Sequence, residues 1–272
     1  MVQFPNGKIN IGLQITGKRP DGYHDLQTIF YPIDIKDIIE SISSHYEGDE
    51  ITFSSSGLPV DGEAMNNLCI KAYQLIKKDY PYLPSIKLHL HKAIPMGAGL
   101  GGGSADGAFT LKLLNEKFDL NLSENKLIEY ALALGSDCPF FILNTPSYAT
   151  GRGELLQPIS LTLTGYSILI VNPNIHINTA WAFKELKLKS HSIELAQAIK
   201  EPMHNWKELI TNDFEEPVFK THPAISELKN YLYRNGAIYA SMSGSGSTIF
   251  GIFKNNMRPE LIFPETYFHK WV

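Results

Sequence analysis

Cysteine is scarce in this chain of 272 residues, which contains only Cys69 and Cys138. Two thiols cannot build the disulfide framework of a small secreted scaffold, so we expect both to be reduced in a cytoplasmic protein. The first residues show no apolar segment of the kind found in a secretory signal. Apolar runs stay well short of the roughly 20 residues that a membrane helix requires. We therefore expect no membrane association.

An excess of positive charge is also missing. Lys and Arg total 24 against 28 Asp and Glu, which gives a formal net charge of −4. Nucleic-acid-binding domains concentrate Lys and Arg, so we expect no nucleic-acid partner. A chain of this length fits one large domain or two moderate ones. The turn-forming residues Asn144–Ser147 predict a boundary near residue 150, with domains at 1–150 and 151–272.

Strands and helices are mixed along the chain without a regular order. Alternating apolar residues predict half-buried strands at 9–15 and 86–90. Further strands are expected at 26–33 and 35–43, broken near Pro32 and Asp34, and at 50–54, 168–171, 237–242 and 247–253. Helices are expected at 67–78, 104–116, 123–134, 179–186, 193–199 and 224–235. The mixture favours an α+β fold over a doubly wound parallel sheet.

Glycine is concentrated in one short segment that leads into a predicted helix at Ser104. Glycine loses more conformational entropy on folding than any other residue, so this concentration indicates a backbone that approaches a ligand closely. A glycine loop before a helix N-terminus is typical of a phosphate-binding site. The candidate nucleotide-binding residues of this loop are Pro95, Met96, Gly97, Ala98, Gly99, Leu100, Gly101, Gly102, Gly103, Ser104 and Ala105.

Several interpretations of this glycine loop compete. A Walker A loop requires Gly-Lys followed by Ser or Thr, which is absent. The spacing of Gly97, Gly99 and Gly102 fits the dinucleotide-binding pattern. The preceding strand alternates in polarity, however, whereas a buried parallel strand is continuously apolar. A phosphate loop of a third kind therefore fits best, and a glycine-rich surface loop without a ligand is the remaining alternative.

Four polar segments accompany the loop. Lys8 would place an ammonium near a transferred phosphoryl group, and Asp137 would accept a hydroxyl proton as a general base. Ser243–Ser247 would form a second backbone nest for phosphates, and Asp21–His24 would recognise a base by stacking and hydrogen bonds. Each segment also has a structural interpretation: a solvated lysine, an Asx turn, a hairpin turn and a loop with a packed tyrosine.

Together these motifs resemble the GHMP small-molecule kinases, which include galactokinase, homoserine kinase and mevalonate kinase. That family carries an N-terminal Pro-x-x-Lys segment, a glycine-rich phosphate loop and a C-terminal glycine-rich turn in this order. The resemblance implies a two-domain α+β fold. A ribosomal-protein-S5-like N-terminal domain would hold ATP, and a ferredoxin-like C-terminal domain would hold the substrate. It also implies Mg²⁺ with the ATP, to which we assign no protein ligand.

A narrower resemblance connects Arg19–His24, Leu100–Ser104 and Gly135–Pro139 with one branch of that family. That branch phosphorylates a diphosphocytidyl-methylerythritol in non-mevalonate isoprenoid synthesis. The resemblance implies ATP-dependent transfer to the 2-hydroxyl of this small molecule, by a monomer or homodimer. A GHMP kinase that acts on homoserine or mevalonate is the main alternative. A nucleotide-binding protein without activity and a dinucleotide-dependent oxidoreductase are the others.

The same resemblance implies roles for individual residues. Lys8 and Asp137 fall on the family's catalytic positions, and Asn67 and Lys92 fall on positions that line the adenine side of ATP. Cytosine would lie between the rings of Tyr23 and Phe183 while His24 reads its edge. The residues expected at the substrate are Asn10, Tyr23, His24, Phe183, Gly244, Ser245 and Gly246.

Overall fold

The computed structural model describes residues 1–43, 51–60, 62–191 and 193–272. It groups the chain into two compact units. The first unit comprises residues 1–7, 34–96 and 101–145, and the second comprises 8–33, 97–100 and 146–272. Each unit combines segments from different parts of the chain. The division into domains 1–150 and 151–272 therefore stays a prediction.

A four-stranded sheet forms one layer of the first unit. Its strand order is β1 (Val2–Gln3), β4 (Ile38–Ser43), β6 (Ile86–Lys92) and β5 (Ile51–Gly57). The β5–β6 pair is parallel and the other two pairs are antiparallel. Side chains of β6 alternate between the core and the outer face, as its sequence predicts.

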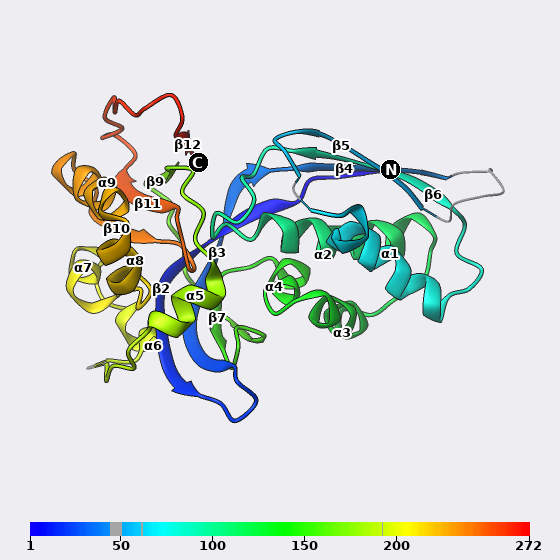
Figure 1. Ribbon diagram of the computed structural model, residues 1–272, viewed down its shortest axis with the longest axis horizontal. Coiled ribbons are helices and arrows are strands. Elements are labelled where there is room, and N and C mark those ends of the chain that lie inside the picture. The colour runs from blue at the N-terminus through cyan, green and yellow to red at the C-terminus, as the bar shows by residue number, and fades with distance from the viewer. Residues whose placement is uncertain (44–50, 61, 192) are drawn as a thin grey trace. The chain divides into compact units, whose positions relative to one another are not determined.

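The helices of the first unit lie on one side of this sheet (Figure 1): η1 (Ala64–Asn66), α1 (Leu68–Asp79), α2 (Gly102–Lys117), α3 (Glu124–Leu134) and α4 (Cys138–Leu143). Helices α1 and α2 pack against the strands, and α3 and α4 pack against these two helices. Asn67 caps α1 because its Oδ1 accepts a hydrogen bond of 2.9 Å from the Cys69 N–H. Ser123 caps α3 in the same way through Lys126. These acceptors satisfy N–H groups that a helix start leaves unpaired. Most of α2 is buried, so this helix forms the centre of the unit's core.

The second unit contains two sheets. In one, β10 (Tyr239–Met242), β11 (Ile249–Lys254), β9 (Tyr166–Asn172) and β12 (Phe268–Trp271) lie in that order, and every neighbouring pair is antiparallel. The strands predicted on either side of Ser243–Ser247 are confirmed, and they pair as β10 and β11. The other sheet has the order β2 (Asn6–Lys18), β3 (His24–Lys36), β7 (Ser147–Thr150) and β8 (Leu155–Pro158).

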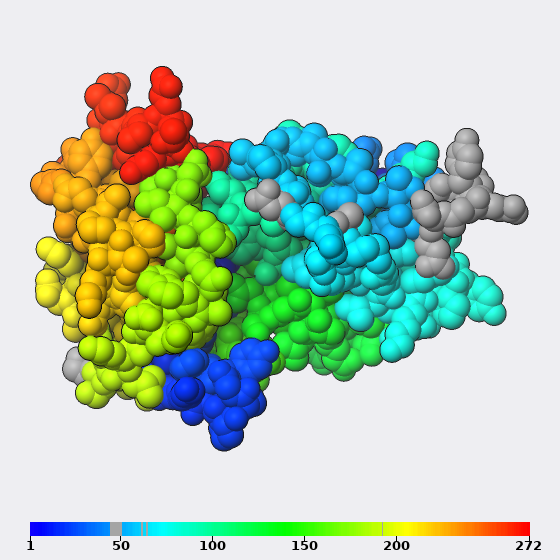
Figure 2. All heavy atoms as spheres, in the orientation of Figure 1, coloured from blue at the N-terminus to red at the C-terminus, as the bar shows by residue number. Residues whose placement is uncertain are grey.

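The helices of the second unit are short apart from the last: α5 (Thr179–Glu185), α6 (Leu195–Ala198), η2 (Met203–Asn205), α7 (Trp206–Leu209), α8 (Glu215–Thr221) and α9 (Pro223–Arg234). Phe214, Val218 and Leu232 pack with strand residues such as Val171 and Ile249 in the unit's core. The segment that precedes β12, red in Figure 2, forms part of the surface. Within the described ranges, no helix combines the length and the apolar character needed to cross a membrane.

Two strand predictions are wrong. Residues 9–15 were predicted as a half-buried strand, but β2, which contains them, is buried on both faces from Asn6 to Ile15. The reason is a second layer: a Cβ placed on Gly12 would lie 2.6 Å from Ile210 and 2.8 Å from Leu195. Pro32 does not interrupt β3, which runs from His24 to Lys36. The break lies instead at Asp37, where the backbone N–H donates to the Pro5 carbonyl at 2.9 Å.

Candidate active site

The glycine loop contributes to both compact units. Residues 97–100 belong to the second unit, whereas Pro95, Met96 and Gly101–Ala105 belong to the first. Gly101 is the N-cap of α2 with a left-handed φ of 69°, and no described side chain caps this helix. A helix start without a side-chain cap presents N–H groups and the positive end of the helix dipole to an anion. A Cβ placed on Gly103 would meet no described atom within 4 Å, which leaves room beside the first turn.

In the second unit, a buried hydrogen-bond network forms around Lys8. The Lys8 ammonium donates to Asn10 Oδ1 at 2.6 Å and to the Gly99 carbonyl at 3.4 Å. It also lies 4.9 Å from the centre of the Phe30 ring. Asn10 Nδ2 donates in turn to Thr28 Oγ1 at 2.9 Å. Lys8 and Asn10 are only 3% and 2% exposed, so the network holds the ammonium in one position.

The glycine-rich turn after β10 closes this network. Ser243 Oγ accepts from the Asn10 backbone N–H at 3.1 Å and donates to the Gly99 carbonyl at 2.8 Å. A Cβ placed on Gly99, which has a φ of +79°, would lie 2.0 Å from the Ser243 carbonyl oxygen. Only glycine fits this close approach. The structure thus brings together the Lys8 segment, the first half of the glycine loop and the turn that contains Gly244, Ser245 and Gly246.

Asp137 lies in the first unit at the N-cap position of α4 and is partly buried. The next residue, Cys138, interacts through its thiol with Ser104. Burial raises the pKa of the Cys138 thiol to about 12. The Asp137 segment therefore lies beside the first turn of α2, the same turn that follows the glycine loop.

The two predicted adenine-side residues differ in environment. Asn67 is partly exposed, and its cap uses Oδ1; its NH₂ group donates to no side chain or carbonyl of the described residues. The Lys92 ammonium has no exposed surface and donates to Asp37 and, at 2.8 Å, to Asp106. Burial lowers the pKa of Lys92, but the attraction of the two carboxylates outweighs it and raises that pKa. Two of the three N–H donors of this ammonium are used by the carboxylates, and the role of Lys92 at adenine stays a prediction.

Of the three rings predicted at cytosine, two stack on each other. The centres of the His24 and Phe183 rings are 5.0 Å apart with an interplanar angle of 18°. The Arg152 guanidinium lies 4.8 Å from the centre of the Tyr23 ring, which is 55% exposed. Burial, and secondly the charge of Lys18, lowers the pKa of His24, which favours a neutral imidazole. Cytosine between Tyr23 and Phe183 stays a prediction, since His24 covers one part of Phe183 here.

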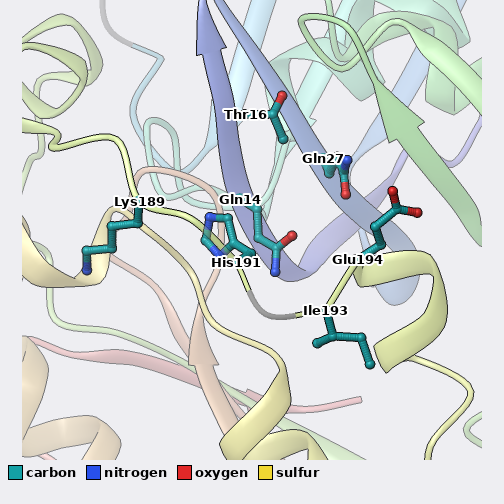
Figure 3. Close-up of a pocket in the computed structure, with 7 residues that line it drawn as sticks. All are labelled: Gln14, Thr16, Gln27, Lys189, His191, Ile193 and Glu194. Carbon is teal, nitrogen blue, oxygen red and sulfur yellow. The ribbon is translucent and has the colours of Figure 1, made fainter.

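A separate pocket of about 230 Å³ lies within the second unit. Side chains of β2 and β3 face the segment that leads into α6 (Figure 3). Nearby, His191 Nε2 lies 3.1 Å from Asp213 Oδ2, which also accepts the Ile15 N–H. No residue of the predicted site is among the seven labelled there: Gln14, Thr16, Gln27, Lys189, His191, Ile193 and Glu194.

Residues 67–145 match the GHMP kinases N terminal domain, and residues 188–265 match the GHMP kinases C terminal domain. Together the two matches cover more than half of the chain. The chain belongs to the GHMP kinase family. The predictions of a small-molecule kinase and of a two-domain α+β GHMP kinase fold are thereby confirmed.

Individual relatives narrow the position of this GHMP kinase within its family. It is 50% identical over 266 residues to the 4-diphosphocytidyl-2-C-methyl-D-erythritol kinase of Bacteroides thetaiotaomicron. The alignment covers 98% of this chain and 95% of the relative. The corresponding kinase of Porphyromonas gingivalis is 43% identical over 96% of this chain and 94% of its own length. A crystal structure of a 4-(cytidine 5'-diphospho)-2C-methyl-D-erythritol kinase has a TM-score of 0.80 and 27% identity, covering 92% of this chain and 89% of that chain.

Sequence reasoning missed several residues that support the GHMP kinase site. Thr28 and the hydroxyl of Ser243 complete the network around Lys8. Asp37 and Asp106 hold the Lys92 ammonium under the start of α2. A single Thr in a strand or Ser in a turn carries no distinctive pattern. A carboxylate within a segment of otherwise buried character, as at Asp106 in α2, is a signal that could have been followed.

Proposed function

We propose that this GHMP kinase transfers the γ-phosphoryl group of ATP to the 2-hydroxyl of 4-diphosphocytidyl-2-C-methyl-D-erythritol. This activity belongs to the non-mevalonate route to isoprenoids. The relatives that carry this name align with almost the whole chain at up to 50% identity. The geometric observation that carries the proposal is the start of α2, where Gly101 leaves the first N–H groups without a side-chain cap.

The residues at this helix start fit a nucleoside triphosphate. Phosphate oxygens would accept hydrogen bonds from the N–H groups of Gly102, Gly103 and Ser104, in the space beside Gly103. No group of three or more His, Cys, Asp or Glu side chains is arranged for a metal in the part of the chain that the structure describes. Mg²⁺ needs no such group because it usually keeps several waters and uses substrate phosphates as ligands. When bound with ATP, it supplies positive charge that stabilises phosphoryl transfer.

Two residues act on the transferring group in this proposal. Asp137 accepts the proton of the substrate 2-hydroxyl as that oxygen attacks the γ-phosphorus, and the bond from the γ-phosphorus to the bridging oxygen breaks and releases ADP. The Lys8 ammonium stabilises the negative charge on the transferring phosphoryl group. The bonds from Lys8 to Asn10 and to Gly99 support this role, because they fix the ammonium before any ligand arrives.

The cytidine end of the substrate would be recognised by the second unit. A neutral His24 offers one N–H donor and one acceptor nitrogen to the edge of cytosine. Tyr23 and Phe183 would supply ring faces for stacking. For Phe183 to accept cytosine on the face that His24 now covers, the His24 ring must swing to the edge of the base.

A cytoplasmic location is part of the proposal. Cys69 and Cys138 are both buried and unbridged, which suits a reducing compartment. The partners are small molecules, ATP and the cytidine-diphosphate substrate.

A substrate panel tests the proposal. Purified protein is incubated with Mg²⁺-ATP and, separately, with 4-diphosphocytidyl-2-C-methyl-D-erythritol, mevalonate and homoserine, and the products are read by phosphorus NMR. We expect a new phosphomonoester resonance with the cytidine compound alone. A higher kcat/KM with mevalonate or homoserine would show that the acceptor has been assigned wrongly.

A further inference from the structure

A buried cluster of three charged residues lies beside the start of α2, and the proposed transfer step does not use it. Asp37 follows β3, Lys92 ends β6, and Asp106 lies in the second turn of α2. All three are at most 3% exposed. Charged side chains are almost never fully buried unless they are paired, so the cluster needs an explanation beyond surface solvation.

Asp37 holds the chain immediately before the loop. Its Oδ1 accepts the backbone N–H groups of Ala93 at 2.6 Å and Ile94 at 2.8 Å. Its other oxygen accepts from the Lys92 ammonium. The residue's own N–H donates to the Pro5 carbonyl, which fixes the carboxylate to the backbone. The strand exit at residues 93–94 is thus tied to one carboxylate by two short hydrogen bonds.

Lys92 connects this anchor to the helix after the loop. Its Nζ donates to Asp106 Oδ2 at 2.8 Å. A Cβ placed on Gly102 would lie 2.9 Å from Lys92 Nζ and 2.9 Å from Ile94 Cγ2. The first residue of α2 therefore rests directly on the ammonium and on the strand exit. Asp106 Oδ1 is buried without a hydrogen-bond partner among the described residues, and Oδ2 accepts the bond that connects α2 to Lys92.

We propose that Asp37, Lys92 and Asp106 form a buried clamp that fixes both ends of the glycine loop and thereby positions it for the triphosphate of ATP. The clamp holds residues 93–94 at one end and α2 at the other, and the loop residues between them are constrained from both sides. The three side chains are positioning residues, since they are buried and act through the loop backbone. This inference rests on the proposed binding of ATP phosphate at the start of α2.

Two substitutions at Asp106 separate the connection from the charge. Asp106→Ala removes the hydrogen bond between α2 and Lys92 but leaves Lys92 paired with Asp37. Asp106→Asn replaces the carboxyl, whose pKa burial raises to about 7, by a neutral amide that keeps an oxygen to accept from Lys92. We expect the alanine variant to raise KM for ATP at least about tenfold, because the loss of one hydrogen bond to a charged group corresponds to about this factor. The asparagine variant stays within about threefold of the wild type, because a neutral acceptor retains most of that bond.

The control is Leu114→Ala, which removes a buried side chain from the same helix two turns beyond Asp106. KM for ATP, KM for the cytidine substrate and the unfolding midpoint are measured for all variants well below that midpoint. The clamp predicts that Asp106→Ala raises KM for ATP but not for the cytidine substrate, and that Leu114→Ala lowers the midpoint without changing either KM. Equal ATP affinity in Asp106→Ala and the wild type would overturn the clamp and leave the proposed function intact.

A measurement on the wild type keeps the test independent of variant folding. Hydrogen exchange of the Ala93 and Ile94 amides should be as slow as that of the interior of β6, because Asp37 holds both N–H groups. Exchange as fast as in an exposed loop would contradict the clamp. Failure of the wild type to bind ATP in calorimetry would remove the proposed function and the clamp together.

Discussion

Replacing Ser243 by alanine tests how the second unit holds its part of the active site. Ser243 is fully buried, and its hydroxyl connects the backbone N–H of Asn10 with the carbonyl of Gly99. In Ser243→Ala the buried Asn10 N–H loses this acceptor. Among the described residues, the Gly99 carbonyl keeps the longer bond of 3.4 Å from Lys8.

The magnitude follows from these two groups. A buried donor or acceptor left without a partner costs about 1–3 kcal/mol. With Asn10 fully deprived and Gly99 partly so, we expect Ser243→Ala to lower the free energy of unfolding by about 2–4 kcal/mol. The matched control is Ser241→Ala, in which the same hydroxyl is removed from a buried serine two residues earlier. In that variant Glu215 still accepts the Met242 N–H at 2.9 Å, so we expect the free energy of unfolding to fall by only about 1 kcal/mol.

Urea unfolding followed by tryptophan fluorescence is the suitable assay. All three tryptophans, Trp181, Trp206 and Trp271, belong to the second unit, so the signal reports on the part of the protein that contains Ser243. At equal slopes, the midpoint of Ser243→Ala should lie well below that of Ser241→Ala. Equal midpoints for the two variants would refute the reasoning, because the Ser243 hydroxyl would then contribute no more to stability than the Ser241 hydroxyl.

Three further predictions concern pH, the thiols and substrate recognition. Burial raises the pKa of Tyr239 well above 10, so the stability from its neutral phenol is present below pH 10 and is lost as the pH rises beyond it. Between pH 8 and about pH 11, the urea midpoint of Tyr239→Phe should therefore fall less than that of the wild type. An equal fall in both proteins would argue against this origin of the pH dependence. Cys69 and Cys138 are buried, and burial raises both thiol pKa values, so Ellman's reagent should react with them only on unfolding. Fast reaction of either thiol in the native protein would contradict their burial. Tyr23→Ala should raise KM for the cytidine substrate and spare KM for ATP, whereas an equal rise in both would speak against a stacking role.

The local elements were the most predictable part of the fold. Helices were predicted to begin at Asn67 and Ser123, and in the structure these two residues cap α1 and α3. The alternation of β6 also predicted its buried face correctly. These features depend on neighbouring residues, which is why a single sequence contains enough information to place them.

Features that depend on distant contacts could not be predicted in this way. The burial of both faces of β2 depends on Leu195 and Ile210, about two hundred residues further along the chain. The short helix α8 and the edge strand β12 lack a strong periodic pattern and were missed. At the candidate site, the motif residues Lys8 and Gly99 were identifiable, but their connection through Ser243 was not, because no spacing rule relates position 8 to position 243.

The most direct test of the proposed reaction is the rate of ATP-dependent phosphorylation of 4-diphosphocytidyl-2-C-methyl-D-erythritol by the wild type and by Asp137→Asn, measured side by side. Asparagine keeps the size of the side chain but cannot accept the hydroxyl proton. We predict that the wild type forms the phosphomonoester and that Asp137→Asn lowers kcat by about 10²–10⁴-fold, while calorimetry shows unchanged binding of ATP and of the cytidine substrate. A variant that retains wild-type turnover would contradict the role of Asp137 as the general base, and a wild type that leaves this substrate unphosphorylated would contradict the proposed reaction itself.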